Sequence, residues 1–177
     1  MSETVLVRYG AVPEVARFAH AEPTPLGRGS RVVVQTRRGT ELGTVLETVR
    51  QLDPTTSEGT VEEPPVLRLA TKTDEAAATT QRQQLLTEFD EWVERIQRWK
   101  LDIELLDIER TLDEEKQILF VLNDQGPDCT KLALYAAAEG LGIIEVQPVN
   151  GEGPVELAVG GCGSGGGGGC GSGGCGS

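Results

Sequence analysis

Short apolar runs, separated by polar or glycine-containing links, dominate the first 50 residues. Residues 5–9 and 14–20 are predicted to form strands. Two Val- and Thr-rich runs within residues 31–49 flank an Arg-Arg-Gly-Thr link at residues 37–40, which predicts a β-hairpin. Gly43 interrupts the second run and predicts a bulge or a close backbone approach. Short twisted strands of this kind predict a small barrel-like sheet.

A helical period replaces this pattern in the middle of the chain. Residues 75–99 contain no Gly or Pro, and Thr71 with Asp74 predicts a capping box at the helix start, with Thr73 as the alternative cap. Residues 76–84 have little to bury and are expected to project or fray. One helical face carries the apolar residues, namely Leu85, Leu86, Phe89, Trp92, Val93, Ile96 and Trp99.

That apolar face has two interpretations. Packing of the face against a sheet is the favoured one. The alternative is a partner-binding surface in which Trp92 and Trp99 make the contacts, because tryptophan is enriched at the energetic centres of interfaces.

The second half of the chain completes an α+β pattern. Residues 103–110 and 117–122 predict an antiparallel pair of strands, and the second run is apolar enough to be covered on both faces. Residues 127–139 predict a helix that begins at a proline and ends before a glycine. A last strand is expected at residues 143–149, ended by Pro148. The order helix, strand, strand, helix, strand predicts an α+β sandwich.

Three parts are therefore expected. Residues 1–65 form a β-rich part with the small barrel-like sheet, and residues 66–150 form the α+β sandwich. Residues 151–177 form a flexible tail rich in Gly, Cys and Ser.

Charge is distributed unevenly along the chain. The net charge is −12, from 16 Lys and Arg against 28 Asp and Glu, which disfavours wholesale nucleic-acid binding. Residues 1–50 are slightly basic, whereas the rest is strongly acidic. A solvated hairpin rim is the favoured interpretation of the densest basic cluster, and a contact with an acidic partner or an RNA backbone is the alternative. This cluster consists of Arg28, Arg31, Arg37 and Arg38.

No catalytic set is evident, and we expect no enzyme. His20 is the single histidine, so His-based metal sites and nucleophile–His–Asp arrangements lack parts. Cys129 lies at a predicted helix start, where a thiol pKa is lowered, but a buried structural cysteine is the more common case. The alternating pattern slips at Leu105 and Leu106. Solvent-facing positions on a sheet edge are expected for the nearby acids, Asp102, Glu104, Asp107 and Glu109.

The glycine-rich tail carries the one candidate metal set. Cys162, Cys170 and Cys175 are three thiols, and Cys129 or another chain would supply a fourth ligand for zinc or an iron–sulfur cluster. The spacing lacks the close Cys-x2-Cys pair of most such sites. A disordered low-complexity tail is the favoured interpretation.

Nothing in the sequence predicts a membrane partner. No apolar run approaches the roughly 20 residues that span a bilayer. The first 15 residues show no basic region followed by an apolar core, so a secretory signal is not expected. We therefore expect a cytoplasmic protein with reduced thiols.

Three segments, in order, resemble the polymerase-suppressor (PSP) C-terminal domain family. Residues 31–47 match its hairpin with an Arg-Gly turn and a glycine in the second strand. Residues 66–75 match its Arg-x-Ala-containing helix start, and residues 101–126 match its Leu-Asp-x-x-Leu-x-Asp-x-Glu strand with the aromatic-containing strand that follows. The resemblance covers roughly residues 26–148.

This resemblance implies a non-catalytic regulatory or adaptor subunit of a cytoplasmic complex, linked to RNA processing or developmental regulation. The partners it implies are small helical regulatory proteins and an endoribonuclease, with RNA contacted indirectly. Related bacterial members continue into cysteine motifs associated with iron–sulfur clusters, whereas here the resemblance ends near Pro148. Two alternatives stay open: a metal or iron–sulfur protein that uses the cysteine tail, and a nucleic-acid-binding module that uses the arginine cluster.

Overall fold

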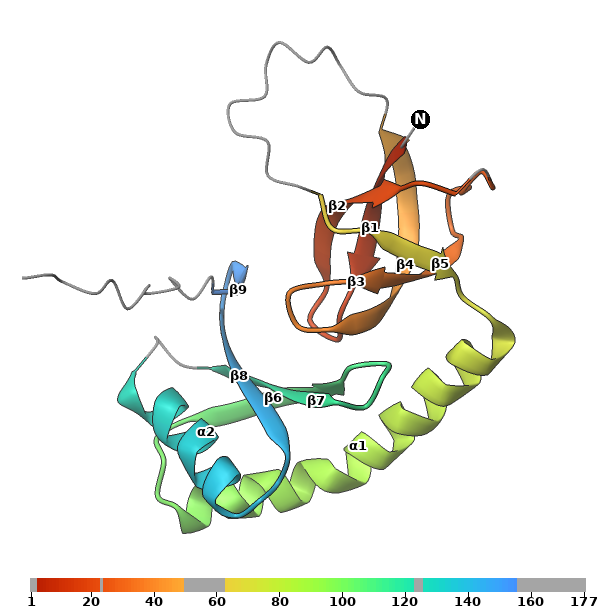
Figure 1. The fold of residues 1–177 in the computed structure, drawn as a ribbon. Coiled ribbons are helices and arrows are strands. Elements are labelled where there is room, and N and C mark those ends of the chain that lie inside the picture. The colour runs from red at the N-terminus through yellow and green to blue at the C-terminus, as the bar shows by residue number, and fades with distance from the viewer. Residues whose placement is uncertain (1–2, 23, 50–62, 123–125, 156–177) are drawn as a thin grey trace, which may run out of the picture.

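The computed structural model describes residues 3–22, 24–49, 63–122 and 126–155, and these residues form two β-sheets and two helices (Figure 1). The α+β class predicted from the sequence is confirmed. The first sheet has the strand order β2-β1-β4-β3-β5. Its strands are β1 (Glu3–Tyr9), β2 (Glu14–His20), β3 (Arg31–Gln35), β4 (Thr40–Val49) and β5 (Val66–Leu69).

The inward face of the first sheet carries a core of β-branched and aromatic side chains that alternate along the strands. This core consists of Val5, Val7, Phe18, Leu26, Val32, Val34, Val45 and Val66. Gly43 of β4 lies so close to β1 that a Cβ atom would clash with the Val7 side chain. The close approach predicted at Gly43 is therefore confirmed.

The barrel-like closure expected for the first sheet is not confirmed. The ladder of strands ends at β2 on one side and at β5 on the other. These two edges approach each other near Ala19, whose N–H donates to the Pro64 carbonyl oxygen at 2.9 Å beside a single bridge to Pro65. Strand β5 belongs to the first sheet, so this sheet continues beyond residue 65, where the β-rich part was expected to end.

The second sheet has the order β6-β7-β8-β9. As predicted, β6 (Glu104–Arg110) and β7 (Lys116–Leu122) pair antiparallel. Helix α2 (Pro127–Ala138) then leads to β8 (Ile143–Asn150), which pairs parallel with β7, and β9 (Gly153–Pro154) follows. Pro148 does not end β8, because the strand continues to Asn150 between its two neighbours.

Helix α1 (Lys72–Arg98) runs from the first sheet along the second (Figure 1). The predicted capping box is present: Asp74 N–H donates to Thr71 Oγ1 at 3.2 Å, and Thr71 N–H donates to Asp74 Oδ2 at 2.7 Å. The predicted apolar face packs on the second sheet, where Leu85, Trp92 and Ile96 are buried.

The expectation that residues 76–84 fray is wrong, although most of their side chains are exposed, in line with the expectation that they have little to bury. They form regular helix, and Gln81 is buried and donates to Glu114 Oε1 at 3.2 Å in the β6–β7 turn. This turn covers the early part of α1, which the helix pattern alone does not show. Neither of the two described helices combines the length and the apolarity needed to cross a membrane.

Candidate functional site

The β3–β4 turn of the first sheet holds the two sheets together. Leu112 N–H donates to the Thr40 carbonyl oxygen at 2.7 Å. Arg37 Nη2 donates to Gln147 Oε1 of β8 at 2.8 Å. Gly39 has a φ of 142°, and a Cβ there would lie 3.0 Å from Thr111 Cγ2. The turn therefore needs glycine for its conformation and for its contact with the second sheet.

A buried charge cluster lies at this junction. Arg38 is 2% exposed, and its guanidinium donates to Glu14 Oε1 at 2.6 Å and to Glu41 Oε1 at 3.1 Å. The Thr36 hydroxyl also donates to Glu41. The guanidinium lies over the ring of Phe120 in β7, 5.7 Å from its centroid. Arg38 thus joins strands β2 and β4 of the first sheet to β7 of the second sheet.

Glu109 of β6 brings a third carboxyl group to the cluster. Its Oε2 accepts a hydrogen bond from Ala11 N–H in the β1–β2 turn at 2.9 Å. Burial, followed by repulsion from the Glu41 carboxylate, raises the pKa of Glu109 from 4.5 to about 7, although the Ala11 N–H and Arg38 oppose the shift. Near neutral pH this carboxyl group therefore exists in both protonation states.

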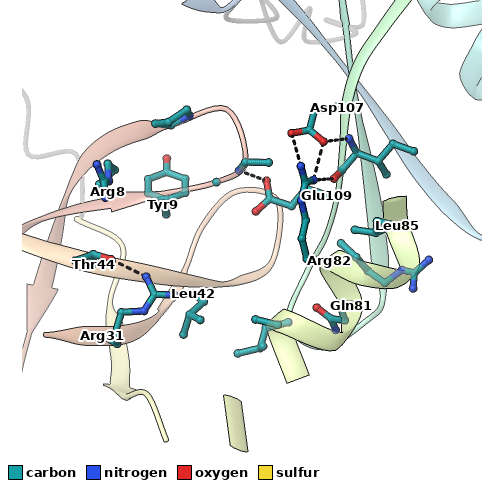
Figure 2. A pocket seen from close by; sticks show the side chains of 17 residues that line it. Arg8, Tyr9, Arg31, Leu42, Thr44, Gln81, Arg82, Leu85, Asp107 and Glu109 are labelled. Carbon is teal, nitrogen blue, oxygen red and sulfur yellow. Dashed lines mark hydrogen bonds and ion pairs between the residues drawn. The ribbon is translucent and has the colours of Figure 1, made fainter. Parts of the chain in front are cut away.

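Beside the cluster, a groove of about 560 Å³ opens between the two sheets and α1 (Figure 2). Its volume is within the range of small-ligand and peptide side-chain pockets. One wall is the outer face of the first sheet and another is the early part of α1. The third wall is the end of β6 with the residues after it. Apolar side chains from all three walls line it, including Leu42, Ala78, Leu85, Ile108 and Leu112.

Two arginines line the sheet wall of the groove. Arg8 of β1 and Arg31 of β3 both lie opposite Thr44 of β4, on the same face of the sheet. Arg31 Nη1 donates to Thr44 Oγ1 at 2.6 Å, and its nearest carboxylate is the half-exposed Glu75 at 3.9 Å. Arg8 is exposed and has no ion-pair partner among the described residues.

The opposite walls have their charges paired. Arg82 of α1 donates to both oxygens of Asp107, at 2.7 and 3.2 Å. Arg110 donates to both oxygens of Glu88 from a single nitrogen, Nη2, at 3.0 and 2.9 Å. Two-point arginine–carboxylate pairs hold both partners in a fixed orientation. The groove therefore combines a preorganised polar wall with a sheet wall that carries free positive charge.

The structure separates the four arginines that are clustered in the sequence. Arg28 is exposed in the loop before β3, and Arg31 lines the groove. Arg37 faces the second sheet, and Arg38 is buried in the charge cluster. The interpretation as a solvated rim therefore does not apply to Arg38, because the second sheet and three carboxyl groups surround it.

The other candidate residues lie away from the groove. Trp92 is 2% exposed in the core, whereas the half-buried Trp99 packs on Tyr135 with 5.5 Å between ring centroids. Cys129 is half-buried, and burial followed by the Asp128 charge raises the pKa of its thiol, opposite to the lowering suggested by its helix position. Cys162, Cys170 and Cys175 lie outside the described residues. Within the described residues, no group of three or more His, Cys, Asp or Glu is arranged to hold a metal ion.

The sequence analysis missed Arg8, Arg82 and Glu109. Glu109 was expected at a solvent-facing position, and this is wrong because the β1–β2 turn covers it. The slip noted at Leu105 and Leu106 was the available signal: β6 changes register there, so that Leu105 pairs with Val121 and Asp107 with Phe120. A bulge changes which side chains face the core.

Comparison of the chain with protein-family models, with curated proteins and with solved structures gave no match. Function is therefore inferred from the residues of the groove and from the resemblance of the three sequence segments.

Proposed function

We propose that this protein is a non-catalytic adaptor, a regulatory subunit of a cytoplasmic complex, and that it binds partner proteins through the groove between its two sheets. The observation that carries this proposal is the sheet wall of the groove. There, in a chain of net charge −12, Arg8 has no ion-pair partner among the described residues, and Arg31 has Glu75 at 3.9 Å. The apolar side chains beside them provide area for a partner to bury.

The resemblance to the PSP C-terminal domain family supports the same site. Residues 31–47 become β3 and most of β4, which supply the sheet wall, and residues 101–126 include β6, which supplies the wall opposite. Two of the three segments that carry the resemblance thus line the groove. On this basis we propose small helical regulatory proteins and an endoribonuclease as partners, and RNA processing or developmental regulation as the process.

Of the two alternatives, nucleic-acid binding receives less support from the geometry. Arg38 is enclosed by Glu14 and Glu41, and Arg37 is engaged with the second sheet, so neither is free to neutralise a phosphate. Affinity for a nucleic-acid backbone grows with the number of phosphates neutralised. Two widely spaced exposed arginines, Arg28 and Arg31, are a weak platform for an extended strand.

Metal binding by the tail cysteines stays a separate proposal with a simple test. The visible absorption spectrum and the metal content of protein purified without oxygen would be compared with those of a variant in which Cys162, Cys170 and Cys175 are changed to Ser. Equal, substoichiometric metal in both proteins would reject it.

A bulky side chain placed in the groove tests the adaptor proposal, because it should block the binding of a partner. Ala78 lines the groove from α1, whereas Ala76 is exposed on the same helix outside it. Ala78→Trp places an indole in the groove, and Ala76→Trp makes the same chemical change at an exposed site with the same cost in helix propensity. Both variants and the wild type would be used for affinity purification from the native cell, with mass spectrometry of the recovered proteins.

The expected result is that wild type and Ala76→Trp recover the same partners and that Ala78→Trp loses them. Matching unfolding curves would show that the two variants are equally folded. Recovery of no specific protein by the wild type, or full recovery by Ala78→Trp, would contradict the proposal.

A further inference from the structure

We propose that the ligand of the groove is a short acidic segment of a partner protein, whose carboxylates bind Arg8 and Arg31 while its apolar side chains lie on the groove's apolar residues. This inference rests on the proposed adaptor function and adds the chemistry of the recognised segment.

The sheet wall places its two arginines at a useful spacing. Arg8 and Arg31 flank Thr44 in one cross-strand row, on the strands to either side of β4. Neighbouring strands are about 4.8 Å apart, so the two arginine backbones are about 10 Å apart across the sheet. Each guanidinium can hold one carboxylate through two N–H donors, and Arg31 spends only one donor on Thr44.

The charges elsewhere in the groove favour this assignment. Asp107 is neutralised by Arg82, and Glu88 by Arg110. Glu109 is covered, and its hydrogen bond with Ala11 N–H holds its carboxyl group in the β1–β2 turn rather than on the sheet wall. The positive charge left for a partner is therefore that of Arg8, which has no ion-pair partner among the described residues, and that of Arg31, whose ion-pair partner among them is Glu75 at 3.9 Å.

An apolar strip lies next to these arginines. Leu42 is on the same face of the sheet, and α1 contributes Leu85 (Figure 2). Ala78 of α1 also lines the groove. A peptide in extended conformation directs successive side chains to opposite sides. A segment with alternating acidic and apolar residues can therefore place carboxylates on the arginines and apolar side chains on the strip.

An acidic peptide fits the groove better than an RNA strand does. Beyond the two arginines, an extended strand would meet the carboxylate of Glu75 and then the surface of a chain whose net charge is −12. Repeated phosphates require repeated basic contacts. A short peptide needs only the two contacts that the sheet wall provides.

The test uses a short fluorescent peptide in which Glu and Leu alternate, titrated with the full chain and followed by fluorescence anisotropy. The same peptide with Gln in place of Glu, and a labelled oligouridylate of equal charge, are the other two probes. The proteins are the wild type, Arg8→Gln, Arg31→Gln, the double variant and Arg28→Gln. Arg28 is exposed outside the groove, so its variant makes the same charge change elsewhere.

We expect the Glu-containing peptide to bind the wild type, with affinity that falls as salt is added. Each groove variant should weaken binding by about tenfold, the loss expected for one charge-assisted contact. Arg28→Gln should stay within about twofold, as for other exposed charges. No binding of the peptide, equal binding of the Gln peptide, tighter binding of the oligouridylate, or an equal loss in Arg28→Gln would each overturn the inference.

Failure of this inference can be told apart from failure of the adaptor proposal. The double variant Arg8→Gln/Arg31→Gln would also be used for affinity purification. If the double variant recovers every partner while Ala78→Trp recovers none, the adaptor proposal is supported and the inference of an acidic ligand segment is rejected. If the wild type recovers no partner, the adaptor is rejected.

Discussion

Replacing Glu109 with Gln removes a carboxyl group whose ionisation opposes the packing of the two sheets. Glutamine has nearly the same shape, and its amide oxygen can still accept the hydrogen bond from Ala11 N–H. What the substitution removes is the negative charge that burial and the nearby Glu41 carboxylate make unfavourable.

The sign and size of the effect follow from the two pKa values. In the unfolded chain the carboxyl of Glu109 has a pKa of 4.5, and in the folded protein its pKa is about 7. Between these values the folded state holds the extra proton, so the contribution of Glu109 to stability is present below pH 4.5 and is lost as the pH rises toward 7. At about 1.4 kcal/mol per pH unit, the full loss is about 3 kcal/mol.

Urea unfolding, followed by tryptophan fluorescence at several pH values, measures this loss. Glu109→Gln should be more stable than the wild type by less than about 1 kcal/mol at pH 5 and by about 3 kcal/mol at pH 8. Glu104→Gln changes an exposed carboxylate on the same strand and should leave the pH dependence unchanged. Parallel pH dependences for the wild type and Glu109→Gln would refute the assignment of a raised pKa to Glu109.

Three further substitutions test the fold around the groove. Arg38→Ala leaves the Glu41 carboxylate buried without its partner and should cost about 3–5 kcal/mol of unfolding free energy, against less than about 0.5 kcal/mol for the exposed Arg28→Ala. Gly43→Ala forces a Cβ into β1 and should cost about 1–3 kcal/mol, whereas Gly27→Ala, with its nearest neighbour 3.9 Å away, should not. Thr71→Ala removes the N-cap of α1 and should lower the free energy of unfolding by about 1 kcal/mol. For each of the three substitutions, a urea midpoint equal to that of the wild type would contradict the role assigned to the residue.

Local chemistry explains which elements the sequence could predict. Thr71 and Asp74 determine the start of α1, and Pro127 determines the start of α2. Each signal lies within the first turn of its own helix. Three consecutive Val residues in β3 likewise favour a strand without reference to distant segments. Strand β5 was not predicted, because its four residues show no alternation and become a strand by pairing with β3.

The site could be predicted only in part, because it depends on contacts between distant segments. Arg37 and Arg38 are adjacent in the sequence, yet one faces β8 and the other is enclosed by carboxyl groups. Glu109 and Ala11 are 98 residues apart, and their hydrogen bond exists only because the two sheets pack together. The sequence indicated Arg31 as a candidate contact residue because other arginines lie near it in the chain. Arg8, the second arginine of the sheet wall, lies near Arg31 only because β1 and β3 both pair with β4.

Site-specific photo-cross-linking in the native cell would test the adaptor proposal most directly. Thr79 is exposed and lines a second hollow that shares Arg31 and Ala78 with the groove. A photoreactive amino acid in place of Thr79 would be compared with one in place of Leu134, which is 62% exposed on α2. The groove account predicts a cross-linked partner protein from position 79 and none from position 134. Cross-links from position 134 alone, or from neither position, would contradict it.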